Sequence, residues 1–139
     1  MSNSKKTYDV IYAGNYTKDT IITLDGTRDV DGGGMNYAAN VGARLGINAA
    51  VITRLAREDQ HVVEAIRAAG IDCYPFYSDL STVMTLEYKT RDVDKRNLYV
   101  KSTAGTILPD YLQGFLTKAI AVSPSLRGEI GRASCRERV

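Results

Sequence analysis

Short apolar runs alternate with segments whose apolar residues recur at helical spacing, and this alternation constrains the fold more than any other feature. The runs YDVIYAG (8–14), INAAVIT (47–53) and IDCYPFY (71–77) are typical of buried strands. Helical spacing separates them, at 38–45 and at 62–69. Strands that alternate with helices form parallel sheets with right-handed crossovers, so the sequence predicts an α/β fold.

A run of three glycines, residues 32–34, precedes the first helical segment in DGGGMNYAANVGARLG (31–46). Glycine accepts positive φ angles and lets a ligand or another chain segment approach the backbone closely. Inside the helix, Gly42 costs about 1 kcal/mol relative to alanine, so we expect it to permit close packing of the helix on the sheet. Gly46 is placed to end this helix.

A different pattern follows the last of these runs. In TVMTLEYKT (82–90) and NLYVKST (97–103), apolar and polar residues alternate on either side of a polar turn, which predicts an antiparallel pair with one wet face. We expect this pair to stand off the core as a β-flap. Another strand is predicted at TIITLDG (20–26), a short helix at 108–112 and one more core strand at 118–124.

The C-terminal segment EIGRASCRERV (129–139) resembles the translation of a common DNA-sequencing adapter, so we expect it not to be native and the chain to be a fragment of a longer protein. Without residues 131–139, which include three arginines and one glutamate, the formal net charge falls from +2 to 0. Nothing electrostatic then indicates binding to nucleic acid or membrane. Low cysteine content and the lack of a signal-like segment predict a cytoplasmic protein.

The order of these elements and several motifs resemble the N-terminal half of the ribokinase family, also called phosphofructokinase-B-type carbohydrate kinases, over about residues 7–128. The principal motif comprises Gly32, Gly33, Gly34, Met35 and Asn36, then Ala38, Ala39 and ARLG (43–46). Other similar segments are GNYTKD (14–19), AAGID (68–72) and SPSLRGE (123–129). The resemblance implies an incomplete, ribokinase-like (Rossmann-like) domain, in which a parallel sheet with flanking helices carries a small antiparallel lid from strands at about 20–26 and 82–103.

The resemblance further implies that the parent protein is a kinase that transfers the γ-phosphate of ATP, with Mg²⁺, to a hydroxyl of a sugar, polyol or nucleoside. The family's catalytic Asp, anion hole and ATP pocket lie in its C-terminal half, and no glycine-rich loop ending in Gly-Asp occurs in this chain. We therefore predict no catalytic residue and no metal ligand here, and an inactive fragment. A homodimer formed through the lid is also expected. The implied substrate-binding residues are Thr17, Asp19, Gly32, Gly33, Gly34 and Asn36.

The chemistry of these residues suits a ligand with many hydroxyls. A carboxylate such as Asp19 accepts strong hydrogen bonds from hydroxyl groups. We expect Asp19 and the glycine turn to meet at the carboxyl edge of the parallel strands, where α/β sheets bind ligands. Alternatively, Asp19 is a turn or cap residue and the glycines serve packing alone. An ungapped alignment also puts Tyr37 in place of the family's Asn, so Asn36 and Tyr37 both stay candidates for that position.

Other functions share parts of this pattern. A dinucleotide-binding oxidoreductase needs G-x-G-x-x-G directly after the first strand, where this chain has only Gly14. A bifunctional sugar kinase/nucleotidyltransferase would share this half, and so would a non-catalytic sugar-binding module. STAGT (102–106) is interpreted as a turn, His61 as a solvated helix residue and Cys73 as a small buried apolar residue.

Overall fold

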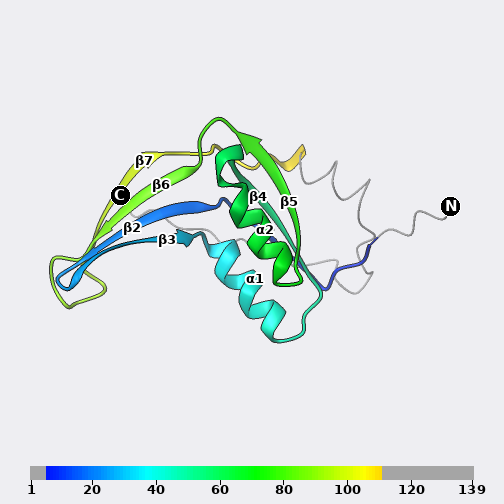
Figure 1. Ribbon diagram of the computed structural model, residues 1–139, viewed down its shortest axis with the longest axis horizontal. Helices are drawn as coiled ribbons and strands as arrows, with labels where there is room; N and C mark the ends of the chain where they lie inside the picture. Colours follow the sequence, from blue (N-terminus) through cyan, green and yellow to red (C-terminus); the bar gives the residue numbers. More distant parts are fainter. Residues whose placement is uncertain (1–5, 111–139) are drawn as a thin grey trace.

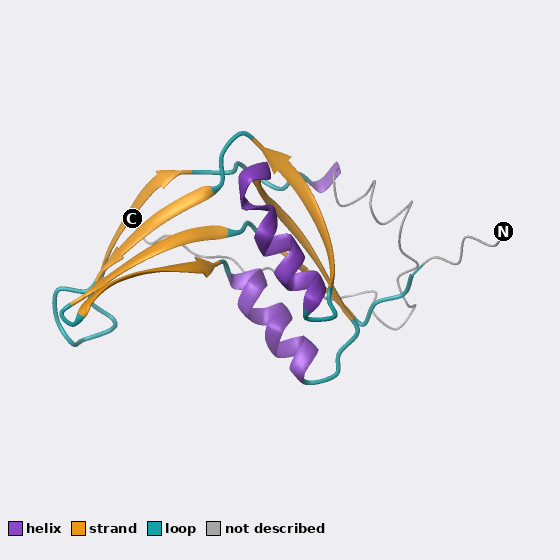
Figure 2. Cartoon of the chain, viewed as in Figure 1, coloured by secondary structure: helices purple, strands orange, loops and turns teal. Residues whose placement is uncertain are grey.

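The computed structural model describes residues 6–110 of the 139-residue chain, and these residues form two sheets (Figures 1 and 2). One sheet is parallel, in the order β1-β4-β5, and comprises β1 (Val10–Ala13), β4 (Ala49–Ala56) and β5 (Asp72–Ser78). The other has the order β3-β2-β6-β7 and comprises β2 (Thr17–Thr23), β3 (Gly26–Gly32), β6 (Thr82–Glu87) and β7 (Asn97–Ser102). We call the four-stranded sheet the lid, and the parallel sheet with its helices the core. The predicted α/β class, with a parallel sheet and added antiparallel strands, is confirmed.

Two helices cover one face of the parallel sheet and lie side by side on it (Figure 1). They are α1 (Gly34–Arg44) and α2 (Gln60–Ala68), the latter preceded by a short 3-10 turn, η1 (Arg57–Asp59). Strand β4 is buried along almost its whole length, as expected for the middle strand of a parallel sheet. Its alternate residues face the helices and share one hydrophobic core with them, which includes Met35, Ala39, Val51, Leu55, Val63 and Ile66.

Cys73 lies in the same hydrophobic core, on β5, and is 3% exposed. Burial raises the pKa of its thiol to about 11, so the thiol is un-ionised at neutral pH. The interpretation of Cys73 as a small buried apolar residue is therefore confirmed.

Glycines decide how α1 packs and where it ends. A methyl group added to Gly42 would lie 2.9 Å from the hydroxyl of Tyr12 on β1, so the predicted close approach of this helix to the sheet is confirmed. Gly46 has a φ of +76°, and the N–H groups of Gly46 and Ile47 donate to the carbonyl oxygens of Ala43 and Gly42. This is the Schellman arrangement that ends many helices, and it needs a residue that tolerates positive φ.

The lid differs from the prediction in one strand. The strand predicted at 20–26 is β2, which begins and ends three residues earlier, and residues 26–32 form an unpredicted strand, β3, antiparallel to it. Most residues of β3 are polar and exposed because it is an edge strand, so it lacks the apolar alternation by which strands are recognised. The antiparallel pairing of β6 and β7 agrees with the prediction, whereas β6 also pairs in parallel with β2.

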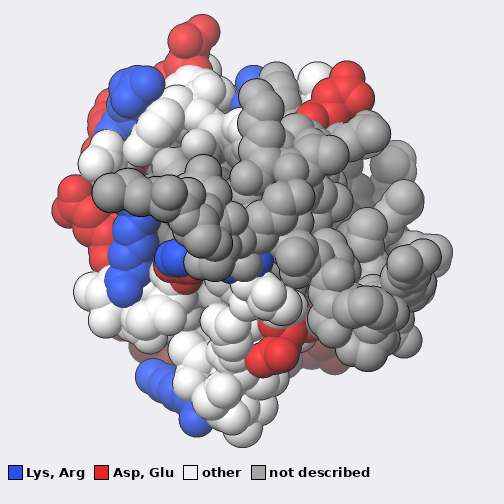
Figure 3. Space-filling view, turned by 90° about the vertical axis from the view of Figure 1, so that its right-hand side faces the viewer, with Lys and Arg blue, Asp and Glu red and all other residues white. Residues whose placement is uncertain are grey.

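Two predicted elements reach beyond the described residues. The short helix at 108–112 lies partly outside them, and the strand at 118–124 lies wholly outside them. Within residues 6–110, no helix has the length and apolar character needed to cross a membrane. Figure 3 shows one face of the molecule. Among the described residues on that face, Lys and Arg side chains lie among Asp and Glu side chains, so both signs of charge are mixed there.

Candidate functional site

Thr17 and Asp19 lie on one face of the lid, directly across from the glycine turn. They are alternate residues of β2, and the pairing with β3 places Thr17 opposite Gly32 and Asp19 opposite Val30. Both are buried, with exposed fractions of 8% and 9%. A methyl group on Gly32 would lie 2.1 Å from Asp19 Oδ2 and 2.6 Å from Thr17 Oγ1, so only glycine leaves room for these two side chains.

The structure therefore brings Asp19 and the glycine turn together, but not in the way the sequence suggested. We expected both to lie in loops at the carboxyl edge of the parallel sheet. Asp19 lies instead within a lid strand, and its contact with Gly32 comes from the pairing of β2 with β3. The difference follows from β3, since without that strand the sequence offered no partner for residues 17–19.

Gly33 joins the lid to the start of α1 in a conformation that favours glycine. Its φ is +102°, and a methyl group there would lie 2.7 Å from the carbonyl oxygen of Asn15 in the β1–β2 connection. The carbonyl of Gly33 accepts from the N–H of Asn36 at 3.0 Å, which begins the helix. The first N–H groups of a helix lack intrahelical acceptors, so the start of α1 offers donors close to the buried oxygens of β2.

Three oxygens of the segment 15–19 are buried without a hydrogen-bond partner among the described residues. The five buried side-chain atoms without one are Asn15 Oδ1, Thr17 Oγ1, Asp19 Oδ1, Arg54 Nε and Thr85 Oγ1. Native structures pair nearly all such atoms, so each exception calls for an explanation. Asn15 Oδ1 and Asp19 Oδ1 are acceptors, and the Thr17 hydroxyl both accepts and donates, so donors supplied by a bound ligand would satisfy the acceptors of this segment.

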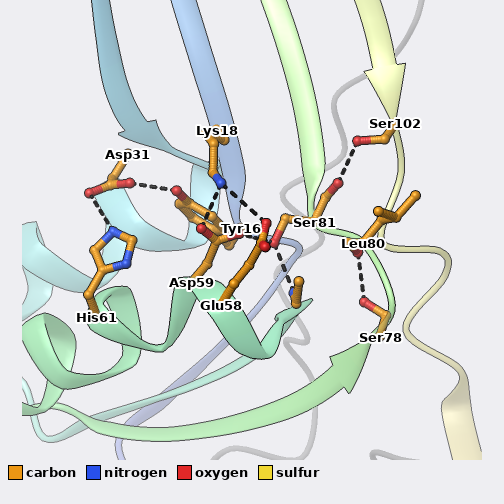
Figure 4. A network of polar contacts seen from close by, with 11 residues as sticks. Tyr16, Lys18, Asp31, Glu58, Asp59, His61, Ser78, Leu80, Ser81 and Ser102 are labelled. Atoms are coloured by element: carbon orange, nitrogen blue, oxygen red, sulfur yellow. Dashed lines mark hydrogen bonds and ion pairs between the residues drawn. The ribbon is translucent and has the colours of Figure 1, made fainter.

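Charge around Asp19 supports the same interpretation. Burial raises the pKa of the Asp19 carboxyl above its usual value, and the neighbouring Thr17 hydroxyl opposes that shift. Lys18 does not neutralise Asp19, because adjacent strand residues point to opposite faces and Lys18 Nζ lies 2.7 Å from Asp59 Oδ1 (Figure 4). A hydroxyl donor near Asp19 would replace part of its lost hydration.

The other two predicted positions lie on α1, and they differ in their surroundings. The Asn36 side chain donates to the Asp31 carbonyl oxygen at 3.3 Å and accepts from Asn40 Nδ2 at 3.0 Å. Both of its polar groups therefore have protein partners, whereas Thr17 Oγ1 and Asp19 Oδ1 have none within residues 6–110. Tyr37 is 57% exposed. Gly34 is the first residue of the helix.

Two residues near this site were missed as site residues by the sequence analysis. Asn15 lies next to the glycine turn, and its Nδ2 donates to the Gly105 carbonyl oxygen at 2.7 Å. Gly105 belongs to the segment that the sequence analysis treated as a turn, and its φ of +84° fits that interpretation. For Asn15 the only signal was its place beside Thr17 and Asp19, since an isolated asparagine after a strand is otherwise an ordinary turn residue.

Two cavities open at the carboxyl ends of β4 and β5, and neither is lined by Asp19 or the glycine turn. One, of about 460 Å³, is lined by residues 56–58 and 77–79. The other, of about 420 Å³, lies between Arg54, residues 77–80 and residues 103–105. No group of three His, Cys, Asp or Glu residues in the described part of the chain could hold a metal ion.

Comparison with known proteins gives a result at the level of structure alone. No family model matches the sequence, and no curated protein matches it. Among solved structures, the chain is similar to a sulfate complex of a pyrophosphate-dependent kinase in the ribokinase family, with a TM-score of 0.67 and 25% identity over 74% of this chain. A pyrophosphate-dependent kinase of that family, complexed with a pyrophosphate analogue and myo-inositol, gives a TM-score of 0.67 and 22% identity over 81% of this chain.

A third similar structure is a ribokinase from Cryptococcus neoformans var. grubii serotype A in complex with ADP, with a TM-score of 0.58 and 16% identity over 78% of this chain. The chain spans between 36% and 38% of the length of these three proteins. It therefore has a ribokinase-like fold, and the domain is incomplete in comparison with them.

Proposed function

We propose that the chain forms the substrate-binding part of a kinase that transfers a phosphoryl group to a hydroxyl of a sugar, polyol or nucleoside. The observation that carries this proposal is a set of buried oxygens on Asn15, Thr17 and Asp19, beside the glycine turn, that have no hydrogen-bond partner within residues 6–110. A polyhydroxylated ligand supplies several O–H donors to such a set, and its oxygens accept from N–H groups at the start of α1. The similarity to ribokinase-family kinases, one of them complexed with myo-inositol, supports the same substrate class.

In this proposal the described residues bind and orient the acceptor substrate. Asp19 accepts hydrogen bonds from substrate hydroxyls, and the carboxylate makes these bonds stronger than neutral ones. The lid excludes water from the site when substrate is bound, which limits hydrolysis of the donor. ATP with Mg²⁺ is the proposed donor. No group of three His, Cys, Asp or Glu residues within residues 6–110 could hold a metal ion, so we derive no step through Mg²⁺.

The proposal is tested with the longer coding sequence that contains this chain. We expect its purified product to phosphorylate one of D-ribose, D-fructose, myo-inositol and adenosine when ATP or pyrophosphate is supplied with Mg²⁺. The 139-residue chain alone should bind the same compound in isothermal titration calorimetry without turning it over. Binding without phosphorylation by the longer protein would identify a sugar-binding module instead, and the absence of both would contradict the proposal.

We also propose that the parent protein forms a homodimer through the lid. Leu98, Tyr99 and Val100 on the edge strand β7 are between 46% and 49% exposed, and an exposed apolar edge strand readily pairs with another chain. Sedimentation velocity should therefore show a dimer for the parent protein, and Val100→Lys should shift it to the monomer. A monomeric parent protein at micromolar concentration would contradict this expectation.

A further inference from the structure

Lys18, Asp59 and Ser81 form a polar cluster at the junction of lid and core, which we call the Lys18–Asp59–Ser81 hub (Figure 4). Asp59, in the turn before α2, is 3% exposed. Its Oδ1 lies 2.7 Å from Lys18 Nζ on β2, and its Oδ2 accepts from Ser81 Oγ at 2.5 Å. The hub thus joins a lid strand, the start of a core helix and the segment that leads into β6.

Ser81 extends the hub to the ends of two more strands. Its Oγ accepts from the N–H of Ala56, the last residue of β4, at 2.9 Å. Its carbonyl oxygen accepts from Ser102 Oγ, at the end of β7, at 2.8 Å. Ser81 is 4% exposed, so these bonds form away from solvent, where leaving any one of them unmade is costly.

The charges of the hub are compensated within the hub itself. Burial alone would raise the pKa of Asp59, but hydrogen bonds from Lys18 and Ser81 outweigh burial and lower it. The hydrogen bond to Asp59 raises the pKa of Lys18. Both groups are therefore charged at neutral pH, and each carboxylate oxygen of Asp59 already has a donor. Asp19 Oδ1, by contrast, has no hydrogen-bond partner in the described part of the chain.

Lys18 and Asp19 are neighbours in β2, so their side chains leave opposite faces of the strand. Fixing one side chain therefore determines where the other points, since a shift of one residue in register would exchange the two faces. A second set of hydrogen bonds holds Tyr16, the residue before β2. The Tyr16 N–H donates to Thr53 Oγ1 of β4 at 3.0 Å, and its hydroxyl donates to Asp31 Oδ1 of β3 at 2.5 Å.

We propose that Lys18 is a positioning residue, whose ion pair with Asp59 anchors β2 to the core so that the Asp19 carboxylate is held against the glycine turn. The proposal deepens the proposed function and rests on it for the role of Asp19. Lys18 does not touch the substrate in this account. Its contribution is to keep Asp19, which lies two residues along β2 from the Thr17–Gly32 pair, in its buried position before a ligand arrives.

The test follows the Asp19 carboxyl by NMR titration in the 139-residue chain without ligand. Lys18→Met is combined with Asp59→Asn so that no unpaired charge stays buried in the hub. We expect the titration midpoint of Asp19 to fall towards that of an exposed aspartate, because a released β2 lets water reach the carboxyl. Loss of the Lys18 charge alone would raise the midpoint and loss of the Asp59 charge alone would lower it. Because the double variant removes both charges together, their opposite effects largely cancel, so a clear fall reports movement of β2.

Two variants serve as comparisons. Lys95→Met removes the Lys95–Asp92 ion pair of 3.2 Å within the lid and should leave the Asp19 midpoint unchanged. Lys18→Arg keeps the charge and should also preserve it. If the double variant does not fold, Lys18→Gln replaces it. Glutamine keeps a hydrogen-bond donor at position 18 but carries no charge, and the Asp19 midpoint is compared with that of the unmodified chain in the same way. An unchanged or higher Asp19 midpoint in a folded hub variant would overturn the proposal.

Ligand binding provides the second measurement. For whichever of myo-inositol, D-ribose, D-fructose or adenosine binds the unmodified chain, the hub variant should bind about tenfold more weakly, and Lys18→Arg should restore the affinity. Unchanged affinity would also overturn the positioning role. If none of the four binds the unmodified chain, the proposed function fails, while the titration still decides whether the hub holds Asp19.

Discussion

Gly33→Ala is expected to lower the free energy of unfolding by about 3 kcal/mol, the upper end of the cost of holding an ordinary residue in a conformation suited to glycine. Gly33 has a φ of +102°, and its added methyl group would lie 2.7 Å from the Asn15 carbonyl oxygen. Backbone cannot move as cheaply as the end of a side chain, so the clash adds to the conformational cost. Urea denaturation followed by circular dichroism measures the change.

Gly46→Ala is the matched control, because Gly46 also has positive φ, +76°, but a methyl group there would meet nothing within 4 Å. Its cost should be about 1 kcal/mol, from backbone conformation alone. The difference between the two variants then measures how tightly the glycine turn packs on the β1–β2 connection. Equal costs for both variants would show that this packing is looser than the structure indicates.

The elements that could be predicted from sequence are those whose apolar pattern reflects burial. Strand β4 is buried on both faces and reads as a continuous apolar run, and α2 shows helical spacing because one side packs on the sheet. Strand β3 is an edge strand with mostly exposed side chains, so its sequence records no burial and it was missed. The parallel pairing of β2 with β6 was missed as well, because pairing between distant segments leaves no local pattern.

The candidate site was predictable to the extent that its residues lie in two short motifs, GNYTKD (14–19) and the glycine motif that begins at Gly32. Asp19 and the glycines were proposed together, and the structure places Asp19 against Gly32. The Lys18–Asp59–Ser81 hub was not foreseen, because its members lie far apart in the sequence and belong to residue types that are usually exposed. Only the fold shows that Asp59 and Ser81 are buried and that Lys18 reaches them.

The site and the hub show two uses of a buried aspartate in one lid-to-core junction. Asp59 has a donor on each oxygen, so its charge is compensated and it stabilises the arrangement. Asp19 is buried, and its Oδ1 has no hydrogen-bond partner among residues 6–110, so its charge costs stability until a donor arrives. Natural proteins accept such a cost at sites where a ligand later makes the missing bonds.

Asp19→Asn should accordingly raise the stability of the folded chain at neutral pH. Burial raises the pKa of Asp19 above its value in the unfolded chain, so the folded state holds the proton more tightly and is destabilised once the carboxyl ionises. As the pH falls through the folded pKa and below the unfolded value of about 3.9, this penalty disappears. Thermal unfolding should therefore show a higher Tm for the variant at pH 7 and no such advantage at pH 3.

The same substitution should weaken ligand binding by about ten- to hundredfold, the usual loss when a hydrogen bond to a charged group is replaced by a neutral one. Calorimetry with the compound that binds the unmodified chain measures this change. Asp29→Asn is the matched control, since Asp29 lies in the same hairpin, where its Oδ1 accepts from Thr20 Oγ1 at 2.7 Å on the other face of the lid. Asp29→Asn should leave affinity unchanged. If Asp19→Asn gains stability yet binds the ligand as tightly as before, Asp19 is not part of the binding site. Its burial would then be a feature of the fold alone.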